Sequence, residues 1–400
     1  MSKFKSIFFL FLVFLFINLL TSFFAKKYVP YLGFFPYVDV IKQYGLPPLI
    51  TSFANFDGAH YLSIAKHSYA QYEQAYFPLY PLLINFFSPL FKKNLLTTGL
   101  VISNLSFFLG LVFCYKFLKK ILKGNEIGWF FIFLLLFPTS FFFSAVYTEG
   151  LFFLLITASF YFLQKKNYLF VSFFTFLAST TRVIGIFLII PVFFHLYANR
   201  VRFRLKHLAV LLSPVAGFAA YAIYLLKTTG DPLFFFHSQP LFGAQRSASI
   251  IFLPQVYFRY LKIFITARWN FQYFVSLIEF FIFNLVFLVI AIDLLSSVKN
   301  RWLVRKGSRQ RASNEHWREK NLWQAPPESI GLSLFSLANL ILPTLTGTFS
   351  SIPRYALFSF SFFLSLSQIK NNLIKIIICV VFFLLHTTLL ALFIQGYFIS

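Results

Sequence analysis

The residues best suited to chemistry in this sequence are a few ionisable side chains set among apolar neighbours. Asp57 and His60 stand three residues apart, so on one helical turn both side chains would face the same way. Glu149 is the one charged residue in the stretch 129–164, and a lone carboxylate at membrane depth needs a partner or a function. Further ionisable residues occur in three later segments: Arg182, Asp231 with His237, and Arg354.

These residue types suit chemistry on a phosphate ester. Arginine binds phosphate oxygens bidentately and stays charged at any relevant pH, so Arg182 and Arg354 could hold a phosphodiester and stabilise the charge it gains on leaving. A carboxylate placed against a hydroxyl group would act as a general base. The sequence contains no glycine-rich phosphate loop, no paired Asp-x-Asp and no histidine cluster. We therefore expect neither a nucleotide-binding domain nor a metal or other cofactor.

Each of these residues also has a structural explanation. Asp57 and His60 could be a loop acid beside an unrelated histidine, and Glu149 could be a buried acid that pairs with Arg182. The guanidinium of Arg354 could extend to the membrane interface. The aromatic stretch Tyr76-Phe77-Pro78-Leu79-Tyr80-Pro81 could be an interfacial aromatic belt or the wall of a lipid-binding site.

The composition decides which class of protein must position these side chains. The 400 residues are 59% hydrophobic and 12% charged, about half the charge of a soluble domain, so the chain is expected to be an integral membrane protein. Its net charge of +24 does not indicate nucleic-acid binding, because the basic residues form short clusters between apolar stretches. Cys114 and Cys379 lie far apart in apolar stretches and do not form a metal-binding spacing.

A spanning helix needs about 20 mostly apolar residues. This length predicts spans near residues 6–25, 95–115, 127–145, 148–163, 207–226, 272–295, 329–346, 354–369 and 373–396. The apolar stretch 168–198 is too long for one span and has Arg182 at its middle, so we expect two short helices that meet there. The prediction is an all-α polytopic membrane protein of one domain, residues 1–400, with about eleven membrane-spanning helices.

With the N-terminus in the cytoplasm, the short basic loops fall on the cytoplasmic side, and Lys92 and Lys93 are the exceptions. A basic cytoplasmic loop is expected at 297–325, and two long outer segments at 26–94 and 227–271. This topology brings the ionisable residues, which come from five separate segments, to one outer face. That coincidence favours a functional site over five separate structural explanations.

Six blocks in this order resemble the motifs of the PIG-V mannosyltransferases, which include the GPI mannosyltransferase 2 proteins and their bacterial relatives. The blocks are Phe56-Asp57-Gly58-Ala59-His60-Tyr61, Tyr76-Phe77-Pro78-Leu79-Tyr80-Pro81, Phe137-Pro138-Thr139 with Ser144-Ala145-Val146-Tyr147-Thr148-Glu149, Thr181-Arg182, Gly230-Asp231-Pro232-Leu233 and Ile352-Pro353-Arg354-Tyr355. They run from about residue 55 to 360. Phe56 stands where the family usually has Trp, and Gly150 where Ser is common.

The resemblance implies a GT-C glycosyltransferase fold with a long first extracytoplasmic loop, and inverting transfer of mannose from a polyprenyl- or dolichyl-phosphate mannose to a glycan or glycolipid acceptor. Asp57 matches the expected catalytic base, and His60 would orient the base or the phosphate. The expected site is catalytic Asp57, His60 and Glu149, with substrate-binding Tyr80, Tyr147, Arg182, Asp231, His237, Gln239, Arg354 and Tyr355.

Two alternatives to this function stay open. One is a GT-C transferase that uses another polyprenyl-phosphate sugar, and the other is a lipid or solute transporter, because transporters also carry charges within the membrane. The expected partners are the lipid-linked donor, the acceptor and the bilayer. The expected location is a bacterial inner membrane, or the endoplasmic reticulum membrane in a eukaryote.

Overall fold

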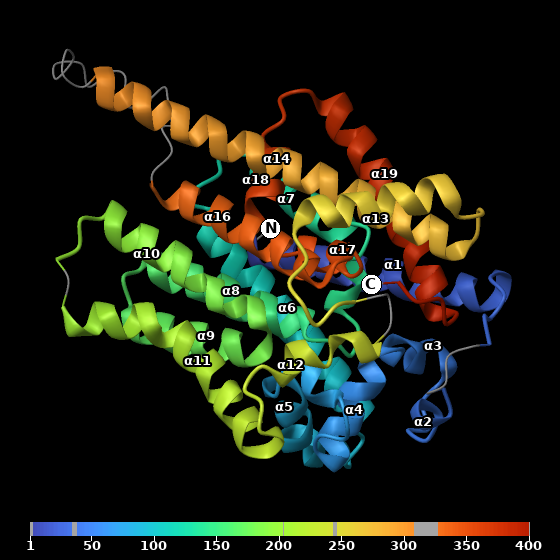
Figure 1. Cartoon of the computed structure of the whole chain (residues 1–400). Helices are drawn as coiled ribbons and strands as arrows, with labels where there is room; N and C mark the ends of the chain where they lie inside the picture. The colour runs from blue at the N-terminus through green and yellow to red at the C-terminus, as the bar shows by residue number, and fades with distance from the viewer. Residues whose placement is uncertain (1–2, 34–37, 203, 243–245, 308–326, 400) are drawn as a thin grey trace.

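A computed structural model describes residues 3–33, 38–202, 204–242, 246–307 and 327–399 of the chain (Figure 1). Every regular element in these residues is a helix, which confirms the all-α prediction. A helix satisfies its backbone hydrogen bonds internally, so an all-helical architecture is compatible with a lipid bilayer.

Six helical segments are long and apolar enough to cross a membrane, which confirms a polytopic membrane protein. They are α1 (Lys3–Tyr28), α6 (Leu95–Leu118), α11 (Leu205–Thr229), α14 (Phe271–Gly307), α16 (Pro327–Ile341) continued by η7 (Leu342–Thr346), and α19 (Asn372–Ile394).

The other five expected spans contain shorter helices, so the count of eleven crossings stays a prediction. These helices are α7 (Glu126–Leu136) with η4 (Ser140–Phe143), α8 (Glu149–Gln164), α9 (Tyr168–Thr181), η5 (Val183–Leu188) with α10 (Ile189–Ala198), and α17 (Ile352–Ala356) with α18 (Phe360–Ser367). The expected break at Arg182 is confirmed. The structure has no continuous helix over 127–145 or over 354–369, so these two predictions were wrong. In the first, α7 ends just before Pro138, because a proline disfavours the helical conformation of the residue that precedes it.

The expected basic loop at 297–325 is also partly wrong, because α14 continues as far as Gly307. Residues 308–325 of that loop lie outside the described residues. The helix therefore extends beyond the apolar stretch that ends at Val298.

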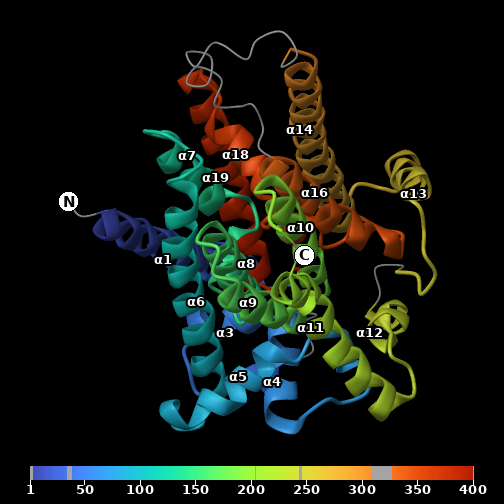
Figure 2. The ribbon, with the colours of Figure 1, turned by 90° about the vertical axis from the view of Figure 1, so that its left-hand side faces the viewer.

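The two expected outer segments fold into short helices rather than irregular loops. The first contains α2 (Val38–Lys42), α3 (Pro48–Thr51), η1 (Ser52–Ala54), α4 (Asp57–His67), η2 (Glu73–Ala75), α5 (Leu79–Phe87) and η3 (Ser88–Phe91). The second contains α12 (Phe234–His237), η6 (Gln239–Phe242) and α13 (Leu253–Thr266). In two perpendicular views, α3, α4 and α5 gather at one end of the molecule (Figures 1 and 2).

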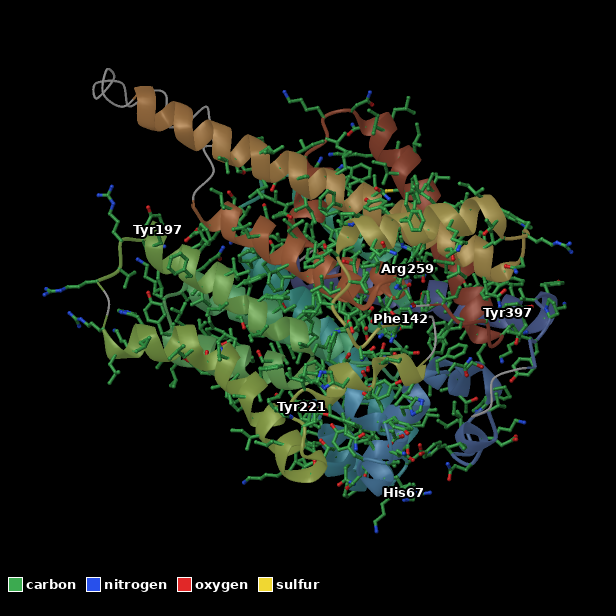
Figure 3. All side chains as sticks on the ribbon, in the orientation of Figure 1. His67, Phe142, Tyr197, Tyr221, Arg259 and Tyr397 are labelled. Atoms are coloured by element: carbon green, nitrogen blue, oxygen red, sulfur yellow. The ribbon has the colours of Figure 1, made fainter. Side chains whose placement is uncertain are left out.

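Phenylalanine rings fill the interior between the helices, with Phe142 in the middle of the molecule (Figure 3). Phe107 stacks on Phe143 with ring centroids 4.3 Å apart, and Phe153 stacks on Phe360. Where helices approach most closely, glycine replaces the rings, as is usual in membrane proteins. A Cβ on Gly150 would lie 2.4 Å from the Ser103 carbonyl oxygen, so α8 can approach α6 only with glycine there.

The substitution Gly150→Ala should therefore destabilise the protein by about 1 to 3 kcal/mol, the usual cost of overpacking a filled interior. The matched control is Gly128→Ala on α7, where a Cβ would meet nothing within 4 Å. Thermal unfolding in detergent should show a lower midpoint for the first variant and an unchanged or higher one for the second. Equal midpoints would show that α6 and α8 are not packed this closely.

Candidate functional site

Four side chains of alternating charge form a chain of contacts at the centre of the site. Arg182 donates from Nη1 to Glu149 Oε1, and Arg354 Nε lies 3.1 Å from the same oxygen. Arg354 Nη1 then donates to Asp57 Oδ2 at 2.6 Å. Glu149 is completely buried, both arginines are at most 9% exposed and the Asp57 side chain is 19% exposed, so the four charges neutralise one another with little access to water. We call these residues the charge chain.

The charge chain decides between the structural explanations of Glu149 and Arg354. The alternative in which Glu149 pairs with Arg182 is confirmed, and Glu149 pairs with Arg354 as well. The alternative in which Arg354 extends to the membrane interface is wrong, because its guanidinium is buried against two acids.

A strained turn places Asp57 at the start of α4. Phe56 has φ 57° and ψ −117°, the values of the second residue in a type II′ turn, where glycine is preferred. The Gly58 amide donates to the Asn55 carbonyl, which also accepts the Tyr147 hydroxyl at 2.8 Å. The Phe56 ring packs on Phe393, and these contacts hold the strain in place.

Gly58 does not provide this turn, because the residue with positive φ is Phe56. Gly58 instead allows a close approach between two segments. A Cβ at position 58 would lie 3.3 Å from the Val146 carbonyl oxygen.

Helix ends and aromatic faces hold the remaining members of the charge chain. Glu149 is the first residue of α8, where the helix dipole favours a negative charge. Arg182 occupies the extended residue between α9 and η5, and its guanidinium lies 4.8 Å from the Tyr355 ring centre. Arg354 lies over the rings of Phe142 and Tyr147, each at 5.2 Å. Cation–π contacts of this kind stabilise a guanidinium that has lost its water.

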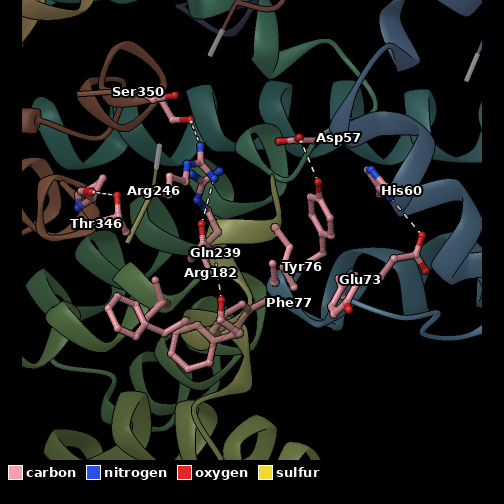
Figure 4. A pocket seen from close by; sticks show the side chains of 18 of the residues that line it. Asp57, His60, Glu73, Tyr76, Phe77, Arg182, Gln239, Arg246, Thr346 and Ser350 are labelled. Atoms are coloured by element: carbon pink, nitrogen blue, oxygen red, sulfur yellow. Dashed lines mark hydrogen bonds and ion pairs between the residues drawn. The ribbon is translucent and has the colours of Figure 1, made fainter. Parts of the chain in front are cut away.

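A cavity of about 920 Å³ opens beside the charge chain (Figure 4). Seven of the eleven predicted site residues line it: Asp57, His60, Arg182, His237, Gln239, Arg354 and Tyr355. They come from α4, the α9–η5 junction, α12, η6 and α17. The structure therefore brings together residues that lie almost 300 positions apart in the sequence.

The other four predicted site residues are not part of the cavity lining. Tyr80 is buried and donates its hydroxyl to the Gly99 carbonyl at 3.0 Å, while Tyr147 supports the turn before Asp57. Glu149 contacts Arg182 and Arg354 on their side away from the cavity. Asp231 accepts from His237 at 2.6 Å near the surface, so it positions a cavity residue. Direct substrate contact by these four residues does not fit their positions.

Sequence reasoning missed a second group of cavity residues beside Asp57. The Tyr76 hydroxyl donates to Asp57 Oδ1 at 3.2 Å, and its ring stacks on His60 (Figure 4). His60 Nδ1 lies 3.2 Å from Glu73 Oε1. Burial raises the pKa of Glu73, but hydrogen bonds from His60 and the Ala70 amide lower the pKa by more than burial raises it. The pKa of Glu73 therefore lies below its usual value. Tyr76 could have been found from its aromatic motif, whereas Glu73 gave no signal beyond its place in an outer segment.

The Asp57 carboxyl is ionised at neutral pH. Burial raises its pKa, but the charge and hydrogen bond of Arg354 outweigh burial, and His60 and Arg246 lower it further. The net effect is a pKa below the ordinary value. Asp57 is thus a carboxylate fixed by an arginine on one oxygen and a tyrosine on the other.

Arg246 is the other residue that sequence reasoning missed. It donates to Gln239 Oε1 at 2.9 Å and to Ser351 Oγ at 3.1 Å, and it lines the cavity. Its only signal in the sequence was its place in the expected outer segment 227–271.

An apolar groove of about 590 Å³ adjoins the cavity. It lies between α10, α11 and α16, and its lining consists of aliphatic and phenylalanine side chains, among them Phe193, Leu211 and Ala338. Leu342 and Leu345 line both the groove and the cavity. A charged space and an apolar space therefore lie next to each other.

Within the described ranges, no three His, Cys, Asp or Glu side chains cluster closely enough to hold a metal ion. No protein-family model, curated protein or solved structure matches this chain. The site is therefore interpreted from its own geometry.

The charge chain predicts that Glu149→Gln will be strongly destabilising. Removing this charge leaves Arg182 without its acid partner in a buried position, a change that costs about 3 to 5 kcal/mol. The control, Asp39→Asn, removes an exposed pair with Lys42 and should change stability little. Thermal unfolding of the two purified variants measures these changes in stability. A Glu149→Gln protein as stable as the parent would show that water reaches the buried charges.

Proposed function

We propose that the protein is a membrane glycosyltransferase that moves a sugar from a polyprenyl-phosphate donor to a hydroxyl group of a glycan or glycolipid acceptor. The supporting observation is the wall that Leu342 and Leu345 share between a charged cavity and an apolar groove. The resemblance of the sequence motifs to the PIG-V family suggests mannose as the sugar, a GT-C fold and an extracytoplasmic site.

The chemistry of the donor matches the two spaces. A polyprenyl-phosphate sugar joins a hydrophilic sugar and one phosphate to a long hydrocarbon chain, so it needs a polar pocket, a cation and an apolar track. The cavity contains arginines and hydroxyl groups, and the groove beside it is apolar. Such a donor already has a good leaving group, so the enzyme needs no nucleotide-binding domain.

In the proposed reaction, the acceptor hydroxyl attacks the anomeric carbon of the sugar from the side opposite the phosphate. The bond between that carbon and the phosphate oxygen breaks, and its electron pair leaves with the polyprenyl phosphate. The proton of the acceptor hydroxyl passes to Asp57. Attack from the opposite side inverts the configuration at the anomeric carbon.

The environment of Asp57 sets how it acts as a base. A carboxylate with a lowered pKa is a weak base, so it orients the hydroxyl and accepts its proton late, when the nucleophile has become more acidic. Arg354 and Tyr76 fix its two oxygens. Glu149 and Arg182 act as positioning residues, because they hold Arg354 in place from behind.

A lipid transporter is the second candidate, favoured by the same adjacency of cavity and groove. The two functions differ in what happens to the substrate. Membranes incubated with radiolabelled polyprenyl-phosphate mannose will move label to a new product if the protein is a transferase. A transporter would move the intact lipid between leaflets and form no new product. Bacterial inner membranes are the first source of acceptor to test in this assay, and endoplasmic reticulum membranes are the second.

The proposal predicts that Asp57→Asn will lower turnover by about 10²- to 10⁴-fold, the usual contribution of a general base. The protein should stay folded, since Arg354 keeps its pair with Glu149. Asp39→Asn, in the same outer segment but exposed, is the matched control and should keep full turnover. Transfer by Asp57→Asn at the parental rate would remove Asp57 from this role.

The groove gives a separate prediction. Ala338→Trp should fill part of the groove and raise the KM for a long-chain donor by about ten-fold, equal to the loss of about two buried CH₂ groups. The KM for a short-chain donor analogue should not change. Ile223→Trp, at a position of α11 that is 53% exposed, is the control for a large ring at the lipid-facing surface. The same rise in KM for both donors would contradict a chain in the groove.

A further inference from the structure

Arg246 differs from the other two arginines of the cavity in its partners. Arg182 and Arg354 both pair with acids, so their charges are largely neutralised within the charge chain. Among the described residues, the hydrogen bonds of Arg246 go to two uncharged side chains, Gln239 and Ser351. Asp57 and Glu279 are close enough to feel its charge but do not form an ion pair with it. Its positive charge is therefore available to an anion.

The surrounding structure fixes the direction of the Arg246 side chain. Gln239 donates its amide to the Phe235 carbonyl at 3.0 Å, which turns its side-chain oxygen towards Arg246. The backbone after Arg246 is fixed to η7, because the Ser247 amide donates to the Thr346 carbonyl at 2.8 Å. A long side chain held in advance in this way loses less entropy when it binds a ligand.

The wall around Arg246 offers further hydrogen-bonding groups. The hydroxyl residues Thr346, Ser350 and Ser351 line the same cavity as Arg246, although the Thr346 hydroxyl already donates to the Pro343 carbonyl at 2.8 Å. Figure 4 shows Ser350 close to Arg246. A guanidinium beside several hydroxyl groups is the donor set that suits phosphate oxygens.

The position of Arg246 also suits a lipid. The Ile251 amide donates to the Leu345 carbonyl at 2.8 Å, so the segment that carries Arg246 runs alongside the residue shared by cavity and groove. An anion on Arg246 would thus have its attached chain close to the groove. Asp57 lies on another wall of the same cavity, as inverting transfer requires of a base and a leaving group.

From these observations we infer that Arg246, and neither Arg182 nor Arg354, is the principal ligand of the donor's phosphate. This inference rests on the proposed function and specifies its substrate class as an isoprenoid lipid with a single phosphate. The charge chain is neutral as a unit, so Arg246 supplies the one positive charge that the phosphodiester needs. It also stabilises the second negative charge that the phosphate gains when the sugar leaves.

Binding of polyprenyl phosphate to the full-length protein in nanodiscs tests the inference without requiring transfer. Arg246→Gln should weaken binding by about ten- to hundred-fold, the loss expected for hydrogen bonds to a charged group. Arg246→Lys should restore part of the affinity. The matched control is Arg259→Gln, since Arg259 lies in the same outer segment but donates to the Gly347 carbonyl outside the cavity lining. Polyprenol, which lacks the phosphate, should bind equally to the parent and to Arg246→Gln.

Two results would overturn the inference. Parental affinity of Arg246→Gln for polyprenyl phosphate would show that another group binds the phosphate. An equal loss in Arg246→Gln and Arg259→Gln would show a general effect of positive charge on the outer face.

A failure of the proposed function looks different from both results. The parent would then bind polyprenyl phosphate through Arg246 but release no sugar from any polyprenyl-phosphate sugar offered to it. That outcome would support the phosphate site and leave transport as its use.

Discussion

The neutralisation of four buried charges is the constraint on which the rest of this structure depends. Glu149 has two arginines on one oxygen, and Arg354 has an acid on each side, so removing either of these two residues leaves another member of the charge chain without its ion-pair partner. Long helices alone could not bring these groups together. The chain is broken just before Glu149, at Arg182 and just before α17, and each break delivers one charged group to the same point. The short helices are therefore what the site requires.

Different residues fix the geometry of the site and offer a charge to the cavity. The charge chain is neutral and fixes the geometry of Asp57, whereas Arg246 donates to two uncharged side chains and is the group that we propose for the donor's phosphate. The groove then adds an apolar surface that the charged cavity lacks. Under the proposed function, orienting a carboxylate, binding a phosphate and binding a hydrocarbon chain would fall to three adjacent sets of residues.

Hydropathy predicted much of this fold because the length of an apolar helix is a local property. The break at Arg182 could also be predicted, since a charge at the centre of a span is costly. Breaks near Pro138 and before Phe360 were missed, because their local signals also fit continuous helices. The hydrogen bond from Arg246 to Ser351 depends on a residue distant in sequence, whereas Glu73 meets His60 within one outer segment whose short helices hydropathy did not predict. Tyr80 was misplaced because a tyrosine hydroxyl can bond a buried carbonyl as well as line a cavity.

The sequence separation within the charge chain has a consequence for how the protein is made. Glu149 and Arg182 lie at the start of α8 and just after α9, two consecutive helices, and can enter the bilayer together as a neutral pair. Arg354 is synthesised much later, and Asp57 lies 297 residues before it. Until then one acid is without its partner, so the nascent chain carries an uncompensated charge through most of translation. The charge chain can therefore be completed only after α17 has been made.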